Sequence, residues 1–292
     1  MKNKHLNRIS LTQRLKAYRK HPFSFMLMIL VTLSAVITVG VLVMLVGYIL
    51  INGIPHLNRD MFAWEYNSEN VSMMPAIINT VTMTVTSLLF AVPVGIFSAI
   101  YLVEYSKKGN RLVGIIRLTT ESLAGIPSIV FGLFGYLIFV IFCGFDYSML
   151  SGALTLAIMI LPTIMRSTEE ALKSVPDSFR EGSFGLGAGK LRTVFKIVLP
   201  SAVPGILAGV ILAIGRITGE TAALIYTSGT VTGIPDNLME SGRTLSIHMY
   251  ALLNEGLYTD QAYATAVVLL IMVLGINGLS GLIAGRLSVK KG

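Results

Sequence analysis

Charged residues are scarce in this 292-residue chain. Only 13% of the residues are Asp, Glu, Lys or Arg, whereas an average soluble domain carries about 25%. Hydrophobic residues make up 53% of the chain, and the mean hydropathy is +0.73. This apolar content exceeds what one soluble core can hold and also excludes a disordered chain. The composition therefore predicts an all-α polytopic membrane protein.

Sulfur and imidazole side chains are also few. Cys143 is the single cysteine, and an intrachain disulfide or a thiolate metal cluster each needs at least two. No histidine spacing typical of a zinc enzyme occurs among the four histidines, which are His5, His21, His56 and His248. We therefore expect no catalytic site, no metal site and no cofactor.

A glycine-rich stretch between Gly185 and Gly189 has some likeness to a phosphate-binding loop. The nucleotide-binding pattern requires glycine at position 184 and serine or threonine at position 191, where this chain has Phe184 and Leu191. No nucleotide site is expected, so any ATP-driven motor must be another chain.

Long apolar runs are the main feature of the sequence. Six are long enough to approach the roughly 20 residues that a bilayer core requires, and they cover about residues 22–57, 76–103, 121–143, 149–165, 201–226 and 262–285. Pro93, Pro127 and Pro162 lie inside three of these runs, where each should kink a helix or free a carbonyl group. The sequence thus predicts six membrane-spanning helices.

Lysine and arginine predict which loops face the cytoplasm. Of the 23 basic residues, 20 lie in residues 1–24, 104–120, 166–200 and the C-terminal tail. The alternate loops hold only Arg59 and Arg243, and Arg216 falls inside a span. Short basic loops stay on the cytoplasmic side, so both termini are predicted to be cytoplasmic. This dispersal also accounts for the net charge of +8 without a nucleic-acid partner, and leaves the lipid bilayer as the expected surroundings.

The cytoplasmic segment 166–200 is long and carries apolar residues at spacings near three and four, which predicts short amphipathic helices on either side of a turn at 185–189. Within it, Glu181-Gly182-Ser183 is followed after three residues by Gly187 and, nine residues later, by Ile197-x-Leu199-Pro200. This spacing resembles the EAA loop of ABC importer permeases, with Gly182 and Ser183 in place of two alanines. The glycine lowers helix propensity by about 1 kcal/mol.

The resemblance implies that these residues contact a cytoplasmic ATPase, with Glu181, Gly182, Ser183 and Gly187 forming the helix and turn, and Ile197, Leu199 and Pro200 following it. A plainer interpretation is an amphipathic loop that lies on the membrane surface.

Two further stretches, residues 124–135 and 216–223, resemble the paired permeases of the phosphate ABC importer. The second stretch, together with residues 246–250 and 262–264, is closer to the A-type permease than to its C-type partner. The resemblance implies a type I importer permease fold over residues 70–287, preceded by a basic arm over 1–24 and a first spanning helix over 25–52.

The resemblance further implies a bacterial inner-membrane location and a role in phosphate import. The expected partners are a homologous C-type permease, two copies of a cytoplasmic ATP-binding subunit and an extracytoplasmic phosphate-binding protein. ATP hydrolysis would reside in the partner chain, so this chain itself would not be an enzyme.

Arg216 and Glu220 need a physical reason to lie within a span, because a charge at the centre of such a helix costs about 2.5 to 3.5 kcal/mol. Four residues apart on one helix, they could pair, and a guanidinium suits a tetrahedral oxyanion. We expect that phosphate competes with Glu220 for Arg216. A permanent ion pair that joins helices is the alternative.

Arg166, at the inner end of the fourth predicted span, is a second candidate for the anion pathway. Extension of its head group to the lipid surface is the plainer explanation. Lys107, Lys108, Arg111 and Arg117 are interpreted as topology determinants.

Small residues recur at spacing four in the fifth and sixth spans, at Gly205, Gly209 and Ala213 and at Gly281 and Gly285. They predict close helix packing, either within the chain or in a helix dimer.

Three other functions remain open at this stage. The chain could be a permease for phosphonate, sulfate or molybdate, an ion-coupled secondary carrier that uses Glu220, or a membrane scaffold.

Overall fold

The computed structural model describes residues 22–107 and 109–289. Residues 1–21, which hold most of the predicted basic arm, and residues 290–292 at the C-terminus lie outside the described residues. The chain divides into two units, residues 1–51 and 52–292. Helix α2 (Pro22–Gly53) forms nearly all of the described part of the first unit; it has 32 residues, or about 48 Å, and contains no charged side chain.

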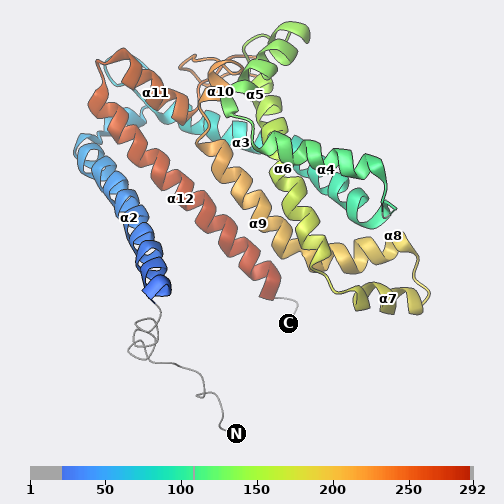
Figure 1. The fold of residues 1–292 in the computed structure, drawn as a ribbon. Coiled ribbons are helices and arrows are strands. Elements are labelled where there is room, and N and C mark those ends of the chain that lie inside the picture. The colour runs from blue at the N-terminus through green and yellow to red at the C-terminus, as the bar shows by residue number, and fades with distance from the viewer. Residues whose placement is uncertain (1–21, 108, 290–292) are drawn as a thin grey trace. The chain divides into compact units, whose positions relative to one another are not determined.

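All regular secondary structure among the described residues of the second unit is helical (Figure 1). Its α-helices are α3 (Met74–Ile100), α4 (Arg111–Ala124), α5 (Ser128–Gly135), α6 (Met149–Lys173), α7 (Asp177–Gly185), α8 (Lys190–Thr193), α9 (Leu199–Thr218), α10 (Ala222–Ile225), α11 (Leu245–Glu255) and α12 (Thr259–Val289). Short 3-10 helices η1 (Ile54–His56) and η2 (Arg59–Phe62) precede α3, and the π-helices η3 (Tyr101–Tyr105), η4 (Tyr136–Phe142) and η5 (Val194–Val198) extend three of the longer elements.

Among the residues that the structure describes, five continuous helical segments are long and apolar enough to cross a membrane, and a bent pair can form a sixth span. The five cover residues 23–56, 74–105, 149–173, 190–218 and 259–282. The bent pair is α4 followed by α5 and η4, which turn by 108° at the break. The predicted all-α, multi-span fold is therefore confirmed.

The bend between α4 and α5 falls at Gly125, Ile126 and Pro127. Proline has no backbone N–H and disfavours helical geometry at the residue before it, and both effects favour a helix break at Ile126. Pro127 thus interrupts its run as predicted. Helices α3 and α6, by contrast, continue through Pro93 and Pro162.

The boundaries of the fourth and fifth predicted spans were wrong. The fourth span was expected to end at residue 165, yet α6 continues to Lys173. The charged residues of this last part pair along the helix, Arg166 with Glu170 and Lys173 with Glu169, so the helix continues where its apolar character ends. The fifth span was expected over 201–226 but runs from 190 to 218.

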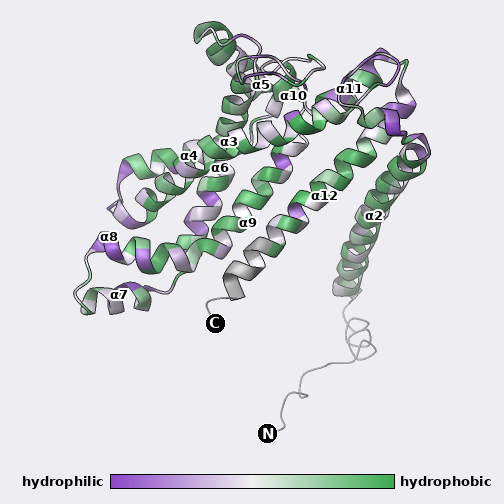
Figure 2. Ribbon diagram, turned by 180° about the vertical axis from the view of Figure 1, so that it is seen from behind, coloured by the Kyte–Doolittle hydropathy of each residue, from purple (hydrophilic) through white to green (hydrophobic). Residues whose placement is uncertain are grey.

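Helix α6 lies at the centre of the second unit and packs against α3, α9, α5 and α4. Its buried face includes Leu156, Ile160 and Ile164, each fully removed from solvent. Figure 2 shows hydrophobic residues along α9 and α12 and hydrophilic residues on α7 and α8. Helices α7 and α8 lie at the opposite end of the unit from α10 and α11 (Figure 1).

The small residues of α9 face α6. A Cβ atom at Gly205 would lie 2.7 Å from the Cβ of Ala171, and one at Gly209 would overlap the side chain of Ser167. Ala213 is fully buried. The predicted close packing is therefore used within this chain by α9, whereas Gly281 on α12 faces open space.

Candidate functional site

Arg216 lies two residues before the end of α9, and about 24 Å along the helix from Pro200. Its side chain is half-buried. Within the described part of the chain, no hydrogen bond or ion pair to Arg216 is found. The guanidinium therefore has its donors available at the end of the unit that carries α10 and α11.

Glu220 does not share a helical face with Arg216, which corrects the expectation of a pair within one helix. Helix α9 ends at Thr218, and Gly219 forms its C-cap. The buried Glu220 carboxylate instead accepts a hydrogen bond at Oε1 from the backbone N–H of Ala223, 3.1 Å away, at the start of α10. A carboxylate there satisfies a helix N–H that has no partner within its own helix.

The break after α9 is held by α11, which in turn is bound by α3. Ser246 Oγ donates to the carbonyl oxygen of Glu220 at 2.6 Å, and the backbone N–H of Leu245 donates to Thr80 Oγ1 at 2.8 Å. The sequence could not predict these contacts, because their partners are 26 and 165 residues apart. The local signals for the break are Gly219, a residue type that often ends a helix, and Thr221, a residue type that often begins one.

Arg166 lies in the C-terminal part of α6 and lines a cavity of about 480 Å³ between α4 and α6. Its Nε donates to Glu170 Oε1 at 3.1 Å, and both side chains are exposed. Thr163 and Ser167 also line this cavity, whereas Arg216 does not. The two arginines singled out from the sequence therefore belong to different places in the fold.

Arg117 has an acidic partner on a helix later in the chain. Its Nη2 lies 2.6 Å from Glu169 Oε1, and Lys173 Nζ binds the same oxygen at 2.6 Å. The Arg117 Nε atom is buried and has no hydrogen-bond partner among the described residues. Arg117 therefore connects α4 to α6 in addition to any role in topology.

The predicted turn and flanking helices of the 166–200 segment are present. Helix α7 carries Glu181, Gly182 and Ser183, and α8 begins at Lys190 after a turn at Gly187 with φ +80°. Ser183 and Thr193, both buried, join the two helices through their hydroxyl oxygens, 2.8 Å apart. Glu181 and Gly182 are exposed.

Ile197 lies in η5, and Leu199 and Pro200 begin α9, so this part of the motif belongs to the spanning helix and not to a separate loop helix. Around the turn, four large apolar side chains are exposed, namely Phe179, Phe184, Leu186 and Leu191. Leu186 is 91% exposed. Apolar groups of this kind, gathered on a short polar segment, are typical of a protein contact surface.

A second cluster of polar groups lies near the start of α11. The Cζ atom of Arg243 is 4.7 Å from the centre of the Tyr66 ring, and the His248 ring meets the same tyrosine edge-on at 6.2 Å between centroids. Burial and then the charge of Arg243 lower the pKa of His248 to about 3. Burial also lowers the pKa of Arg243, against the opposing effects of Tyr66 and Glu255.

Long apolar helices, a half-buried arginine within a span and an exposed apolar turn at one end define a multi-pass membrane protein. The chain belongs to the family of binding-protein-dependent transport system inner membrane components, whose model matches residues 91–289. It is therefore a multi-pass inner-membrane protein.

Several individual permease proteins are similar to this chain over most of its length. The chain is 33% identical over 263 residues to the probable ABC transporter permease protein YqgI of Bacillus subtilis, covering 84% of this chain and 89% of that protein. It is 35% identical over 229 residues to the phosphate transport system permease protein PstA of Pasteurella multocida, covering 77% and 81%. PstA of Mycobacterium leprae is 36% identical over 205 residues, covering 69% and 67%. The resemblance to phosphate importer permeases is confirmed.

Solved structures agree on the fold. An inward-facing MetNI methionine ABC transporter matches with a TM-score of 0.62 at 22% identity, covering 74% of this chain and 95% of that chain. A bacterial ABC transporter for the import of alginate matches with a TM-score of 0.66 at 18% identity, covering 94% and 99%. These matches confirm the type I importer permease fold.

Proposed function

We propose that this chain forms half of the membrane path of an ATP-driven phosphate importer. The observation that carries this proposal is the chain's similarity to PstA proteins over more than two thirds of its length. The partners would be a homologous C-type permease, two copies of a cytoplasmic ATP-binding subunit and an extracytoplasmic phosphate-binding protein.

In this proposal, Arg216 binds the anion on its way through the membrane. Its guanidinium, which has no hydrogen bond or ion pair among the described residues, offers planar paired donors that suit a tetrahedral oxyanion. Glu220 lies four positions further on but is held by the start of α10, so its carboxylate does not occupy Arg216 in this state. Phosphate therefore need not displace Glu220 before it reaches the arginine.

Arg166 would serve nearer the coupling end of the path. It pairs with Glu170, and both side chains are exposed, so their pairing contributes only about 0.3 to 0.5 kcal/mol. An anion in the adjacent cavity could exchange with that carboxylate at little cost. The exposed turn around Gly187 would meet the ATPase, with Glu181 and Gly182 at the contact.

Arg216→Gln tests the proposal in vesicles that contain the four components. The variant keeps a polar side chain but removes the charge, so ATP-driven phosphate uptake should fall at least tenfold while the complex still assembles. Arg59→Gln, an exposed arginine in η2, is the matched control and should retain uptake. Loss of assembly together with uptake would instead support a purely structural arginine.

The same vesicles separate the other candidate functions. Preferential uptake of sulfate, molybdate or phosphonate would assign another oxyanion, and uptake driven by a proton gradient without ATP would assign a secondary carrier.

A further inference from the structure

We propose that Arg180 is a positioning residue that joins the coupling helix α7 to the end of α3 through Glu104. Movement of α7 would then reach α3 and α6 together. This inference rests on the proposed coupling role of the 166–200 segment, and it concerns a residue outside the EAA spacing.

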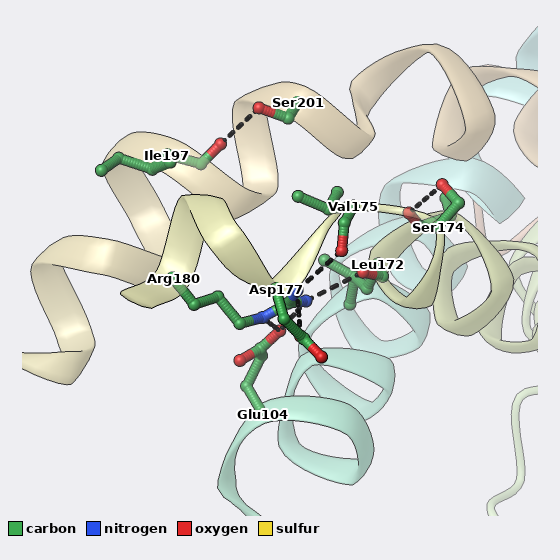
Figure 3. A network of polar contacts seen from close by, with 9 residues as sticks. Glu104, Leu172, Ser174, Val175, Asp177, Arg180, Ile197 and Ser201 are labelled. Atoms are coloured by element: carbon green, nitrogen blue, oxygen red, sulfur yellow. Dashed lines mark hydrogen bonds and ion pairs between the residues drawn. The ribbon is translucent and has the colours of Figure 1, made fainter. Parts of the chain in front are cut away.

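Arg180 makes an unusually complete set of contacts at the junction of three helices (Figure 3). Its Nη2 and Nε lie 2.7 Å and 3.1 Å from Glu104 Oε1, which belongs to η3 at the end of α3. Its Nη2 also donates to the carbonyl oxygen of Leu172 at 2.9 Å, and its Nη1 to that of Val175 at 2.8 Å. One side chain thus binds α3, the last turn of α6 and the linker that follows it.

The carbonyl contacts explain why an arginine suits this position. The last carbonyl groups of an α-helix have no partner within the helix, and a cation near them also interacts favourably with the helix dipole. A guanidinium has five N–H donors in a fixed plane, enough to serve the carboxylate and both carbonyl groups at once. Lysine, with one nitrogen atom, cannot hold all of them in the same geometry.

The Arg180–Glu104 pair is shielded from solvent, whereas the neighbouring pair is not. The side chains of Arg180 and Glu104 are only 15% and 8% exposed. Asp177 binds Arg180 Nη1 at 3.1 Å but is 86% exposed. Removing one member of a shielded pair leaves the other charge uncompensated, while an exposed pair contributes little. The link to α3 therefore dominates over the link within α7.

Helix α8, on the other side of the turn from α7, also contacts the end of α3. Lys190, the first residue of α8, places Nζ 5.1 Å from the ring centre of Tyr105, the residue after Glu104. The buried Ser183–Thr193 contact holds α7 and α8 together. Helix α7 therefore contacts Glu104 and helix α8 contacts Tyr105, which are adjacent residues at the end of α3. A rigid displacement of α7 and α8 would move this end of α3 with them.

The segments that would be displaced, η3, the end of α6 and η5, are continuous with membrane-spanning helices. Beneath the pair, Ile100 of α3, Leu172 of α6 and Val198 of η5 share one buried apolar cluster. Both η3 and η5 are π-helical, and π-helical turns are frequent at functional sites. A displacement at Glu104 is therefore passed to packed helices and not absorbed by a loose loop.

The test uses the whole reconstituted complex with the phosphate-binding protein, and measures three quantities: ATPase subunits bound, ATP hydrolysed and phosphate taken up. Arg180→Ala should retain bound ATPase and keep hydrolysis within about twofold of wild type, while uptake falls at least tenfold. The number of ATP molecules used per phosphate then rises at least fivefold. Arg180→Lys should recover part of the uptake.

Asp177→Asn is the matched control, because it breaks only the exposed pair, and its ATP-to-phosphate ratio should equal that of wild type. Glu104→Gln keeps the side-chain volume and one acceptor oxygen. It should raise the ratio in the same direction, and it remains informative if Arg180→Ala lowers the amount of complex.

Two results would overturn this inference without affecting the proposed function. The first is an unchanged ratio of ATP used to phosphate taken up in both Arg180→Ala and Glu104→Gln. The second is a loss of bound ATPase, ATP hydrolysis and phosphate uptake in strict proportion to one another. The second would show that Arg180 only stabilises the fold. If the wild-type chain binds no ATPase, the proposed function fails as well, and the two failures are distinguished by that wild-type measurement.

Discussion

At the scale of single residues, His248 shows how burial changes the chemistry of a side chain. The ring is fully buried, and Arg243 adds a nearby positive charge, so a proton on the imidazole is strongly disfavoured in the folded state. In the unfolded chain a histidine takes up a proton near pH 6.5. The folded state therefore carries a neutral His248 down to a pH of about 3.

We predict that acidification destabilises the protein through His248. Between pH 6.5 and about 3 the unfolded state binds a proton that the folded state does not, so the free energy of unfolding falls as the pH falls. From pH 7 to pH 5 this loss is about 2 kcal/mol. Thermal unfolding in detergent at both pH values should show that His248→Phe, which keeps the edge contact with Tyr66, loses most of this dependence.

An unchanged pH response in His248→Phe would contradict the assignment.

Gly187 supports a second prediction at this scale. Its φ of +80° is a backbone conformation that costs a side-chain-bearing residue about 1 to 2 kcal/mol. Gly187→Ala should therefore deform the turn and reduce co-purification of the ATPase. Gly189→Ala is the matched control: Gly189 has φ −72° and open space around its Cβ position, so the ATPase should be retained. Equal retention in both variants would show that the turn is not part of the contact.

At the scale of elements, the contact between α6 and α9 depends on the absence of a side chain at Gly209. A Cβ there would overlap the Ser167 side chain, so Gly209→Val should force the helices apart and lower the melting temperature of the purified protein. We expect a cost of about 1 to 3 kcal/mol. Gly281→Ala on α12, where nothing lies within 4 Å, should be neutral or slightly stabilising. Similar melting temperatures for the two variants would contradict the proposed packing.

The elements also show what the sequence could and could not predict. Apolar runs predicted the spans, and glycines at 185, 187 and 189 predicted the turn between α7 and α8, because both signals are local. The continuation of α6 to Lys173 was missed, since charge pairs along one helix keep it folded beyond its apolar part. The end of α9 at Thr218 was missed because Ser246, far along the chain, helps to hold the break.

Some residues of the candidate site could be predicted from the sequence, and others could not. Arg216 and Arg166 stood out from the sequence because charges in apolar runs are rare. The Arg117–Glu169 pair and the Arg180–Glu104 pair did not stand out, because their members are about 50 and 76 residues apart and lie in segments already rich in charge.

At the scale of the whole molecule, the distribution of basic residues predicts sidedness that can be measured directly. Cys143 is the single cysteine and is exposed, and the predicted topology places it on the outer face. A maleimide that cannot cross membranes should label it in intact cells. In a Cys143→Ser background, Leu186→Cys should be labelled only after the membrane is opened, because the turn is predicted to be cytoplasmic. Labelling of Leu186→Cys in intact cells would contradict both the topology and the coupling role.

The pair between Arg117 and Glu169 also has a consequence for how the chain is made. The ribosome adds Glu169 about 50 residues after Arg117, which takes about 3 to 10 seconds at 5 to 20 residues per second. During that interval α4 has no carboxylate from α6 to bind. The contact between α4, which precedes the 108° bend, and α6 is therefore completed only after the later helix has been made.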